Sequence, residues 1–202
     1  MRLGLLALGL VLAACAGARP VPSGSVLFQD SFSDPGSGWH RGLGSDYADG
    51  VYLITVGEPQ TKIWANPGRS FADVIIEVDA STLAGPLDND FGVQCRVRDN
   101  ENYYFFLVSG DGFQVIGEVS EGEAQFLSAE VMQPSAAIQQ GNVTNRLRAA
   151  CIGEELTLAV NGQLVAQTAD NSFVEGDVGL IAGSYSEAGV QVVFDNFAVF
   201  QP

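Results

Sequence analysis

Two carboxylates, Glu77 and Asp79, stand two residues apart in an apolar run that is typical of a β-strand. Because side chains alternate along a strand, both carboxylates project from one face. Hydrolysis of a glycosidic bond uses two carboxyl groups about 5 to 9 Å apart, so the pair is a candidate for sugar cleavage. Val74, Ile76 and Val78 would form the opposite, buried face. We therefore favour the alternative in which the two carboxylates only face solvent.

An aromatic side chain beside polar groups forms a second candidate site. In the segment 61–66, Trp64 shares a strand face with Lys62 and Asn66 rather than with Ile63. A glycan-binding face needs an aromatic platform next to hydrogen-bonding groups. The polar row of the predicted strand 91–98 completes a candidate ligand-binding set of Trp64, Gln94, Arg96, Arg98 and Tyr104. The alternative is that the aromatic residues pack under loops and the arginines offset nearby acids.

Oxygen-bearing side chains leave calcium open as a cofactor. Asp88 and Asp90, with Asn89 between them, precede a predicted strand, and the acidic loop 99–102 follows it. Calcium prefers clustered oxygen ligands, but these loops leave opposite ends of the strand and cannot form one site. Asp and Asn also suit turns for backbone reasons, so a structural turn is the alternative for Asp88 and Asp90.

The sequence offers no other catalytic arrangement. Its one histidine, His40, lies in the Gly- and Ser-rich loop 36–44 and is expected to be an exposed loop residue rather than part of a Ser-His-Asp set. The chain contains no nucleophile elbow, phosphate loop or Cys/His metal pattern. We expect no catalytic residue, no transition metal and no nucleotide cofactor.

The composition excludes several classes of partner. The 202 residues carry 24 acids against 9 bases, a net charge of −15, which repels nucleic acids and anionic membrane surfaces. With 47% hydrophobic and 16% charged residues, the chain is expected to fold as one globular domain.

The N-terminal residues are typical of an export signal. Met1 and Arg2 precede an apolar run over 3–14, which is too short to cross a bilayer core of about 30 Å. The segment Leu12-Ala13-Ala14-Cys15, at the end of this run, resembles the bacterial lipobox. This resemblance implies a signal peptide over 1–14 and a lipid on Cys15, and the alternative is a plain secretion signal with an incidental cysteine. The Ala, Pro, Gly and Ser residues that follow predict a flexible tether over 15–25, ahead of a folded domain over 26–202. The protein is then exported and held at the cell envelope, with the lipid as its only membrane contact.

Two further cysteines, Cys95 and Cys151, are candidates for a disulfide. Each lies on the apolar face of an alternating segment, and an even pair outside the cytoplasm is more often bridged than free. Two buried thiols are the alternative.

From residue 26 onward, the sequence predicts strands and no long helix. Apolar runs with period two recur between Gly, Asn, Asp and Pro clusters. The predicted strands cover residues 26–32, 51–56, 61–65, 71–82, 91–98, 103–109, 113–119, 124–128, 146–152, 156–160, 164–167, 178–184 and 190–200. Asn161-Gly162 is a strong hairpin signal, and turns are expected at 110–112 and 121–123. Strands with one polar and one apolar face predict two antiparallel sheets packed as a β-sandwich.

Several short motifs occur in a characteristic order. They are Phe28-Gln29-Asp30-Ser31-Phe32, Gly38-Trp39, Phe91-Gly92-Val93 with Arg96 and Asp99, Asn102-Tyr103-Tyr104, Val160-Asn161-Gly162, Gly176-Asp177-Val178-Gly179-Leu180 and Phe194-Asp195-Asn196-Phe197. Over residues 26–201 the set resembles the concanavalin A-like, laminin-G-like jelly rolls of bacterial lipoproteins. It is also similar to the domain-of-unknown-function-1080 group, or 3-keto-disaccharide hydrolase-like proteins. The resemblance implies that the first and last strands pair and that one sheet is concave.

The resemblance also bears on catalysis. Glycosidases of this fold carry a run similar to Glu-x-Asp-x-Glu or Glu-x-Asp-x-x-Glu, and here Ser81 and Thr82 occupy the positions of the second glutamate. The leading hypothesis is therefore a non-catalytic, lipid-anchored jelly roll that binds a glycan or a protein of the envelope or cell surface. The alternatives are a carbohydrate-active hydrolase of the 3-keto-disaccharide type and a structural envelope module without a small ligand.

Overall fold

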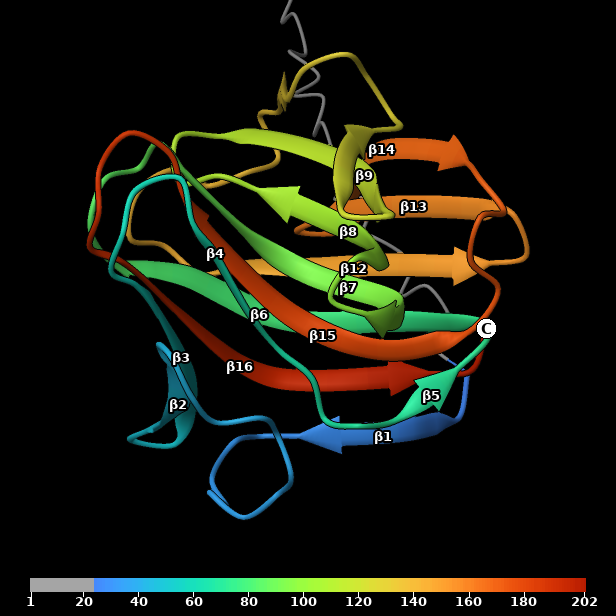
Figure 1. The fold of residues 1–202 in the computed structure, drawn as a ribbon, viewed down its shortest axis with the longest axis horizontal. Helices are drawn as coiled ribbons and strands as arrows, with labels where there is room; N and C mark the ends of the chain where they lie inside the picture. Colours follow the sequence, from blue (N-terminus) through green and yellow to red (C-terminus); the bar gives the residue numbers. More distant parts are fainter. Residues whose placement is uncertain (1–23) are drawn as a thin grey trace, which may run out of the picture.

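The computed structural model describes residues 24–202, and all of its regular structure is β (Figure 1). The strands are β1 (Val26–Asp30), β2 (Ser45–Ala48), β3 (Val51–Val56), β4 (Lys62–Ala65), β5 (Ser70–Phe71), β6 (Val74–Ala84), β7 (Asn89–Asp99), β8 (Asn102–Val108), β9 (Phe113–Ser120), β10 (Glu123–Phe126), β11 (Gln133–Pro134), β12 (Asn145–Ile152), β13 (Glu155–Val160), β14 (Gln163–Ala169), β15 (Gly176–Ser184) and β16 (Val190–Phe200). The predicted signal peptide, lipidated Cys15 and most of the tether lie outside the described residues.

The strands form two antiparallel sheets that pack face to face, which confirms the predicted β-sandwich (Figure 1). Sheet A has the order β14-β13-β12-β6-β16-β3-β2, with β1 also paired to β16. Sheet B has the order β10-β9-β8-β7-β15-β4, with β11 on β9 and β5 on β15. The expected pairing of the first and last strands is present, from Val26 opposite Phe200 to Asp30 opposite Phe197.

Alternation along the strands builds the core between the sheets. On β12, Leu147, Ala149 and Cys151 are buried while the residues between them are partly exposed. On β8 both faces are buried: Tyr104 and Phe106 join the main core, whereas Phe105 belongs to a second apolar cluster. Since the two clusters share alternating residues of one strand, the second cluster lies on the outer face of sheet B.

The turns carry the backbone conformations that their residues favour. Asn161 and Gly162 have φ of 51° and 80°, as the predicted two-residue hairpin between β13 and β14 requires. Glu121 and Gly122, with φ of 53° and 83°, join β9 to β10 in the same way. Strand β2 was not predicted, because its residues 45–48 include only one strong strand former, Tyr47.

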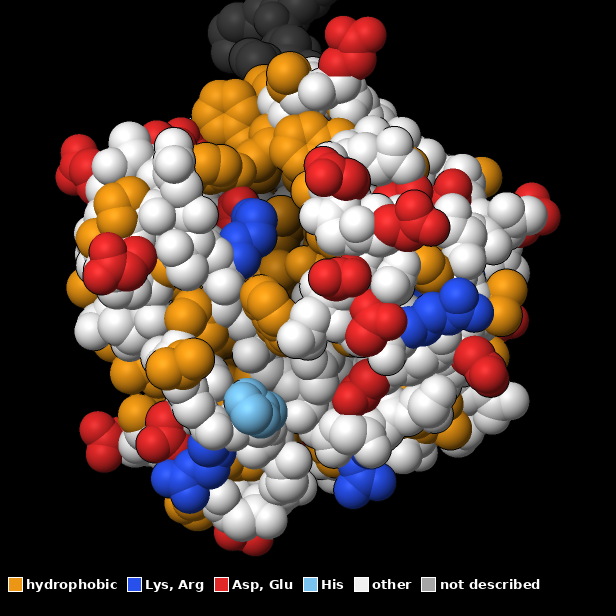
Figure 2. All heavy atoms as spheres, in the orientation of Figure 1, with side chains coloured by type: hydrophobic (Ala, Val, Ile, Leu, Met, Phe, Trp, Pro, Cys, Tyr) orange, Lys and Arg blue, Asp and Glu red, His pale blue; other side chains and the backbone are white. Residues whose placement is uncertain are grey.

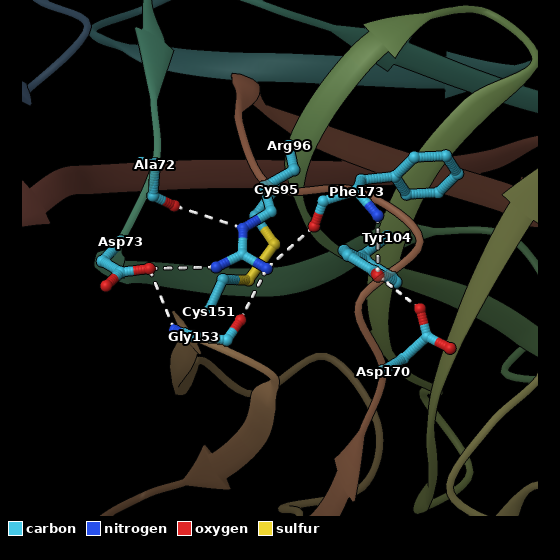
Figure 3. Close-up of a disulfide and its surroundings, with 9 residues drawn as sticks. All are labelled: Ala72, Asp73, Cys95, Arg96, Tyr104, Cys151, Gly153, Asp170 and Phe173. Atoms are coloured by element: carbon cyan, nitrogen blue, oxygen red, sulfur yellow. Dashed lines mark hydrogen bonds and ion pairs between the residues drawn. A yellow bond between two sulfur atoms is a disulfide. The ribbon is translucent and has the colours of Figure 1, made fainter.

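A disulfide joins the sheets: Cys95 of β7 in sheet B is bonded to Cys151 of β12 in sheet A (Figure 3). The predicted bridge is thereby confirmed. Trp39, 3% exposed, packs against Phe32 and Phe197 beside the first and last strands. Both sheets, the core and the disulfide belong to the part of the chain that the structure describes, residues 24–202. None of its elements is a helix long and apolar enough to cross a bilayer.

Candidate functional site

The outer face of sheet B is hollowed, and apolar side chains are visible inside the hollow (Figure 2). Two adjoining pockets occupy this face, one of about 670 Å³ and one of about 570 Å³. Trp64 lines the larger pocket and Tyr103 lines the smaller one, so we call them the Trp64 pocket and the Tyr103 pocket. The two rings lie 6.4 Å apart between the pockets, and Lys62 and Asn100 line both.

The Trp64 pocket combines one large aromatic ring with polar side chains. Trp64 lies on β4 opposite Ile181 of β15 and is partly buried. Its position on the outer face agrees with the predicted alternation, because Ile63 packs against the main core. The polar side chains of this pocket are His40, Ser45, Thr61, Lys62, Asn66, Asn100 and Asp177. An apolar ring bordered by hydrogen-bonding groups suits a ligand with both C–H faces and hydroxyl groups.

Backbone contacts hold two of these polar groups in place. The amide of Asn66 donates to Val178 O at 2.7 Å. The carboxylate of Asp177 accepts from the backbone N–H groups of Gly68 and Arg69, each at 2.8 Å. Burial raises the pKa of Asp177, although these N–H groups stabilise its charged form. Both side chains are therefore fixed at the pocket wall before a ligand arrives.

The Tyr103 pocket has an apolar floor and one polar end. Tyr103, Phe105, Leu107, Val119 and Ile181 line it from β8, β9 and β15, and all are at least nine-tenths buried. Phe126 of β10 stands over Phe105, with the ring centres 6.2 Å apart. The polar end carries Lys62, Asp90 and Tyr185.

Asp90 is the most buried acid of this hollow. Its side chain is 1% exposed, and Oδ2 accepts from Lys62 Nζ, whereas Oδ1 has no hydrogen-bond partner among the described residues. The pair lies flat against β15 because position 183 is glycine: a Cβ there would overlap Asp90 Oδ1 and crowd Lys62. Burial, followed by the charge of Asp90, raises the pKa values of Tyr103 and Tyr185. The Lys62–Asp90 pair thus anchors a compact polar patch in apolar surroundings.

The other residues of the predicted ligand-binding set, Gln94, Arg96, Arg98 and Tyr104, do not line either pocket of the hollow. Tyr104 points into the main core because it pairs with Cys95, and its hydroxyl donates to Asp170 (Figure 3). Gln94 faces outward but is fully buried against β15, and neither amide atom has a hydrogen-bond partner among the described residues. The structure therefore does not bring Gln94, Arg96 and Tyr104 together with Trp64 on one exposed face.

At Arg96 the inward and outward alternation of side chains along β7 is interrupted. The pairing with β8 shifts between Cys95 and Asp99, and Arg96 has φ of 52°, so a β-bulge redirects its side chain. The guanidinium, 2% exposed, donates to three backbone carbonyls, Ala72 at 3.2 Å and Gly153 and Phe173 at 2.9 Å, and to the Asp73 carboxylate at 3.1 Å (Figure 3). The exposed Arg98 lies over the ring of Phe173, 5.6 Å from its centre. Both arginines thus support structure at a different place from the two pockets.

The carboxylate pair of β6 belongs to the outer face of sheet A. Glu77 binds Arg146 and Arg148 of the neighbouring β12, and Asp79 binds Arg146 at 3.2 Å. The side chains of Glu77 and Asp79 are 19% and 29% exposed. This arrangement confirms that the two carboxylates face outward, and arginines of β12 neutralise them.

The two calcium candidates, Asp88 and Asp90, lie in different surroundings. Asp90 is paired with Lys62, whereas Asp88 is exposed and lines another pocket, next to Asp111 and Tyr185. Within residues 24–202, no three His, Cys, Asp or Glu side chains are grouped as metal ligands. His40 is exposed in its loop, as expected.

Sequence reasoning identified Trp64 and placed Lys62 on the same strand face, but it missed Tyr103, Phe105 and Tyr185 as members of the hollow. The run 103–108, Tyr-Tyr-Phe-Phe-Leu-Val, carried a usable signal, because a strand without a polar face is buried on both sides. Which other residues meet its outer face depends on strand pairing, which a single sequence does not reveal.

Comparisons with known proteins establish the fold and assign no family. No protein-family model matches the sequence, and no curated protein matches it either. The structure is similar to the carbohydrate-binding module CBM66 from Bacillus subtilis, with a TM-score of 0.65, 21% identity, and coverage of 82% of this chain and 96% of that one. It is also similar to a protein of unknown function with a galectin-like fold from Bacillus subtilis, with a TM-score of 0.71, 12% identity, and coverage of 89% and 97%. A third similar structure is the Bacillus licheniformis beta-glucanase, with a TM-score of 0.63, 9% identity, and coverage of 91% and 100%. The protein therefore has a concanavalin A-like, galectin-like β-sandwich fold.

Proposed function

We propose that this protein is an exported, lipid-anchored, non-catalytic β-sandwich that binds a glycan in the hollow of sheet B. The observation that carries the proposal is Trp64, a partly buried indole on the outer face whose pocket is lined by polar side chains. A sugar ring offers an apolar C–H face to such an indole and hydroxyl groups to the residues around it. Similarity of the fold to a carbohydrate-binding module is consistent with this function.

The polar groups of the hollow suit recognition better than hydrolysis. Asp90 is held by Lys62, and Asp177 is held by backbone N–H groups. Glu77 and Asp79, the pair first considered for sugar cleavage, bind arginines on the other sheet. Fixed hydrogen-bonding groups favour binding, because they lose little conformational entropy when the ligand arrives.

Export and anchoring complete the proposal. The disulfide is typical of proteins that fold outside the cytoplasm, which supports the export signal inferred over residues 1–14. We propose that the sandwich is displayed from lipidated Cys15, and the mass of the N-terminal peptide of the exported protein checks this part.

A glycan-array screen of residues 24–202 tests the binding function, with release of reducing sugar from the bound glycans measured in parallel. We expect selective binding without hydrolysis, and we expect Trp64→Ala to weaken binding about tenfold. Removal of the ring loses about 0.5 to 1.5 kcal/mol of stacking energy as well as the apolar surface that the ring buries, and about 1.4 kcal/mol corresponds to a tenfold loss of affinity. Phe113→Ala is the matched control, because Phe113 is exposed and lies outside both pockets.

Three outcomes would contradict the proposal. A silent array favours a structural envelope module, and release of reducing sugar favours a hydrolase. Binding that survives Trp64→Ala unchanged would mean that the glycan does not occupy the Trp64 pocket.

A further inference from the structure

We propose that the Tyr103 pocket binds the apolar aglycone of the ligand, so that the recognised molecule is a glycoside with an alkyl or aryl group rather than an unsubstituted sugar. This inference rests on the proposed function, because the sugar itself is assigned to the Trp64 pocket. It names the chemical class of the substituent, which glycan binding alone does not.

The floor of the Tyr103 pocket offers little to a hydroxylated ring. Leu107, Val119 and Ile181 carry no side-chain polar atom, and Phe105 adds only a ring. A sugar placed there would lose its hydrogen bonds to water without replacement, which costs about 1 to 3 kcal/mol for each buried polar group. An alkyl or aryl group gains free energy from the same surface, about 0.8 kcal/mol for each buried CH₂.

The dimensions of the pocket suit such a group. Its volume of about 570 Å³ is within the range of small-molecule sites. Ala124 and Phe126 of the edge strand β10 also line the pocket, beside the floor residues of β9, and Phe126 is 40% exposed. A ligand in this pocket would cover the exposed apolar surface of Ala124 and Phe126.

The polar end of the pocket fixes the orientation of the ligand. Lys62 lines both pockets, and its partner Asp90 lines the Tyr103 pocket. The buried Oδ1 of Asp90 has no hydrogen-bond partner within residues 24–202. A carboxylate oxygen accepts a hydrogen bond from a hydroxyl group. A sugar hydroxyl beside the glycosidic oxygen would therefore lie at the Lys62–Asp90 pair, with the sugar on Trp64 and the aglycone past Tyr103.

The test compares hexyl β-D-glucoside with methyl β-D-glucoside and with hexanol, all below micellar concentrations, on residues 24–202. Binding is followed by methyl NMR, where shifts of Leu107, Val119 and Ile181 locate the ligand. We expect the hexyl glucoside to bind at least about tenfold more tightly than the methyl glucoside, because five added CH₂ groups are partly buried.

Two matched variants show where the gain arises. Ala124 is exposed on the sheet-B edge strand β10 and lines the pocket, and Ala169 is exposed on the sheet-A edge strand β14. Ala124→Trp fills the pocket and is expected to abolish the difference between hexyl and methyl glucosides. Ala169→Trp is expected to preserve it.

The outcomes separate this inference from the proposed function. Equal affinity for the two glucosides overturns the inference, whatever the glycan array shows. The inference is also overturned if the gain persists in Ala124→Trp. A silent array, with hexanol bound as tightly as the hexyl glucoside, overturns the proposed function and the aglycone assignment together.

Discussion

Tyr104 places a phenol inside the sandwich. Its side chain is fully buried, and its hydroxyl donates to Asp170 and accepts from the backbone N–H of Phe173 at 3.1 Å (Figure 3). Burial, with the nearby Asp170 carboxylate, raises the pKa of Tyr104 from 10.0 to about 12. The neutral phenol is therefore part of the folded state.

This shift predicts a loss of stability in alkali. The pKa of Tyr104 is about 12 in the folded state and near 10.0 when exposed, so between these values the unfolded chain binds fewer protons. The free energy of unfolding must then fall as pH rises from about 10 to about 12, whereas below that window the contribution of Tyr104 is fully present and does not change with pH. Urea unfolding across the window, for the wild type and Tyr104→Phe, measures the effect. The variant should be about 1 kcal/mol less stable at neutral pH, because Asp170 loses a donor, but should decline less steeply in alkali. An unchanged pH slope would contradict the assignment, since Tyr52, with its pKa also raised to about 12, is kept in both proteins.

At the scale of elements, the bulge of β7 acts through Arg96. It turns the guanidinium toward three segments, so that one side chain satisfies the carbonyls of Ala72, Gly153 and Phe173. These carbonyls belong to the connections before β6, after β12 and before β15. At the bulge, regular pairing with β8 is interrupted between Cys95 and Asp99, and Arg96 instead holds three connections together at this end of the sandwich.

Arg96→Met tests the clamp. Methionine retains much of the volume but no donor, so three carbonyls lose their partner, and we expect a loss of about 3 kcal/mol in the free energy of unfolding. Arg98→Met is the matched control: Arg98 is exposed over Phe173, and its removal should cost less than about 1 kcal/mol. Chemical denaturation of both variants gives the comparison. Equal losses would show that Arg96 contributes only its charge.

The hollow of sheet B is also a property of elements. Gly183 on β15 lets the Lys62–Asp90 pair lie against the sheet, and Gly117 on β9 lets the ring of Phe105 cross it. Glycine weakens a strand when nothing approaches its missing side chain. Here the missing side chains make room for the groups that line the Tyr103 pocket.

At the scale of the whole molecule, the disulfide is the covalent link between the layers. Cys95 and Cys151 are separated by 56 residues and lie in different sheets. A bridge that closes a loop of this size restricts the unfolded chain by about 4 kcal/mol in the loop-entropy model. The apolar core between the sheets contributes independently of it.

We therefore expect Cys95→Ala/Cys151→Ala to fold with a free energy of unfolding lower by about 2 to 4 kcal/mol. Urea unfolding measures the change, and reductant added to the wild type should produce a similar loss. Reductant should have no effect on the double variant. Equal stability with and without the bridge would mean that the two sheets are held by packing alone.

Features that depend on residues close together in the sequence could be predicted from it. Period-two alternation and turn residues are local, so the segments around all thirteen predicted strands, the Asn161-Gly162 hairpin and the inward cysteines could be recognised in the chain. The same alternation correctly placed the side chain of Trp64 on the opposite face of its strand from Ile63. The alternation on β7 misled at Arg96, because a bulge interrupts it there.

Which residues meet in the candidate site depends on contacts between strands that are far apart in the sequence. Lys62 and Asp90 meet because β4 and β7 both flank β15, and Tyr103 meets Trp64 across the same sheet. Such neighbours depend on strand order and register, which are set by the packing of all the strands together. The amino-acid pattern thus specified a two-layer β protein with an outward tryptophan. The folded arrangement added the apolar hollow and its buried ion pair, because only there do side chains far apart along the chain come into contact.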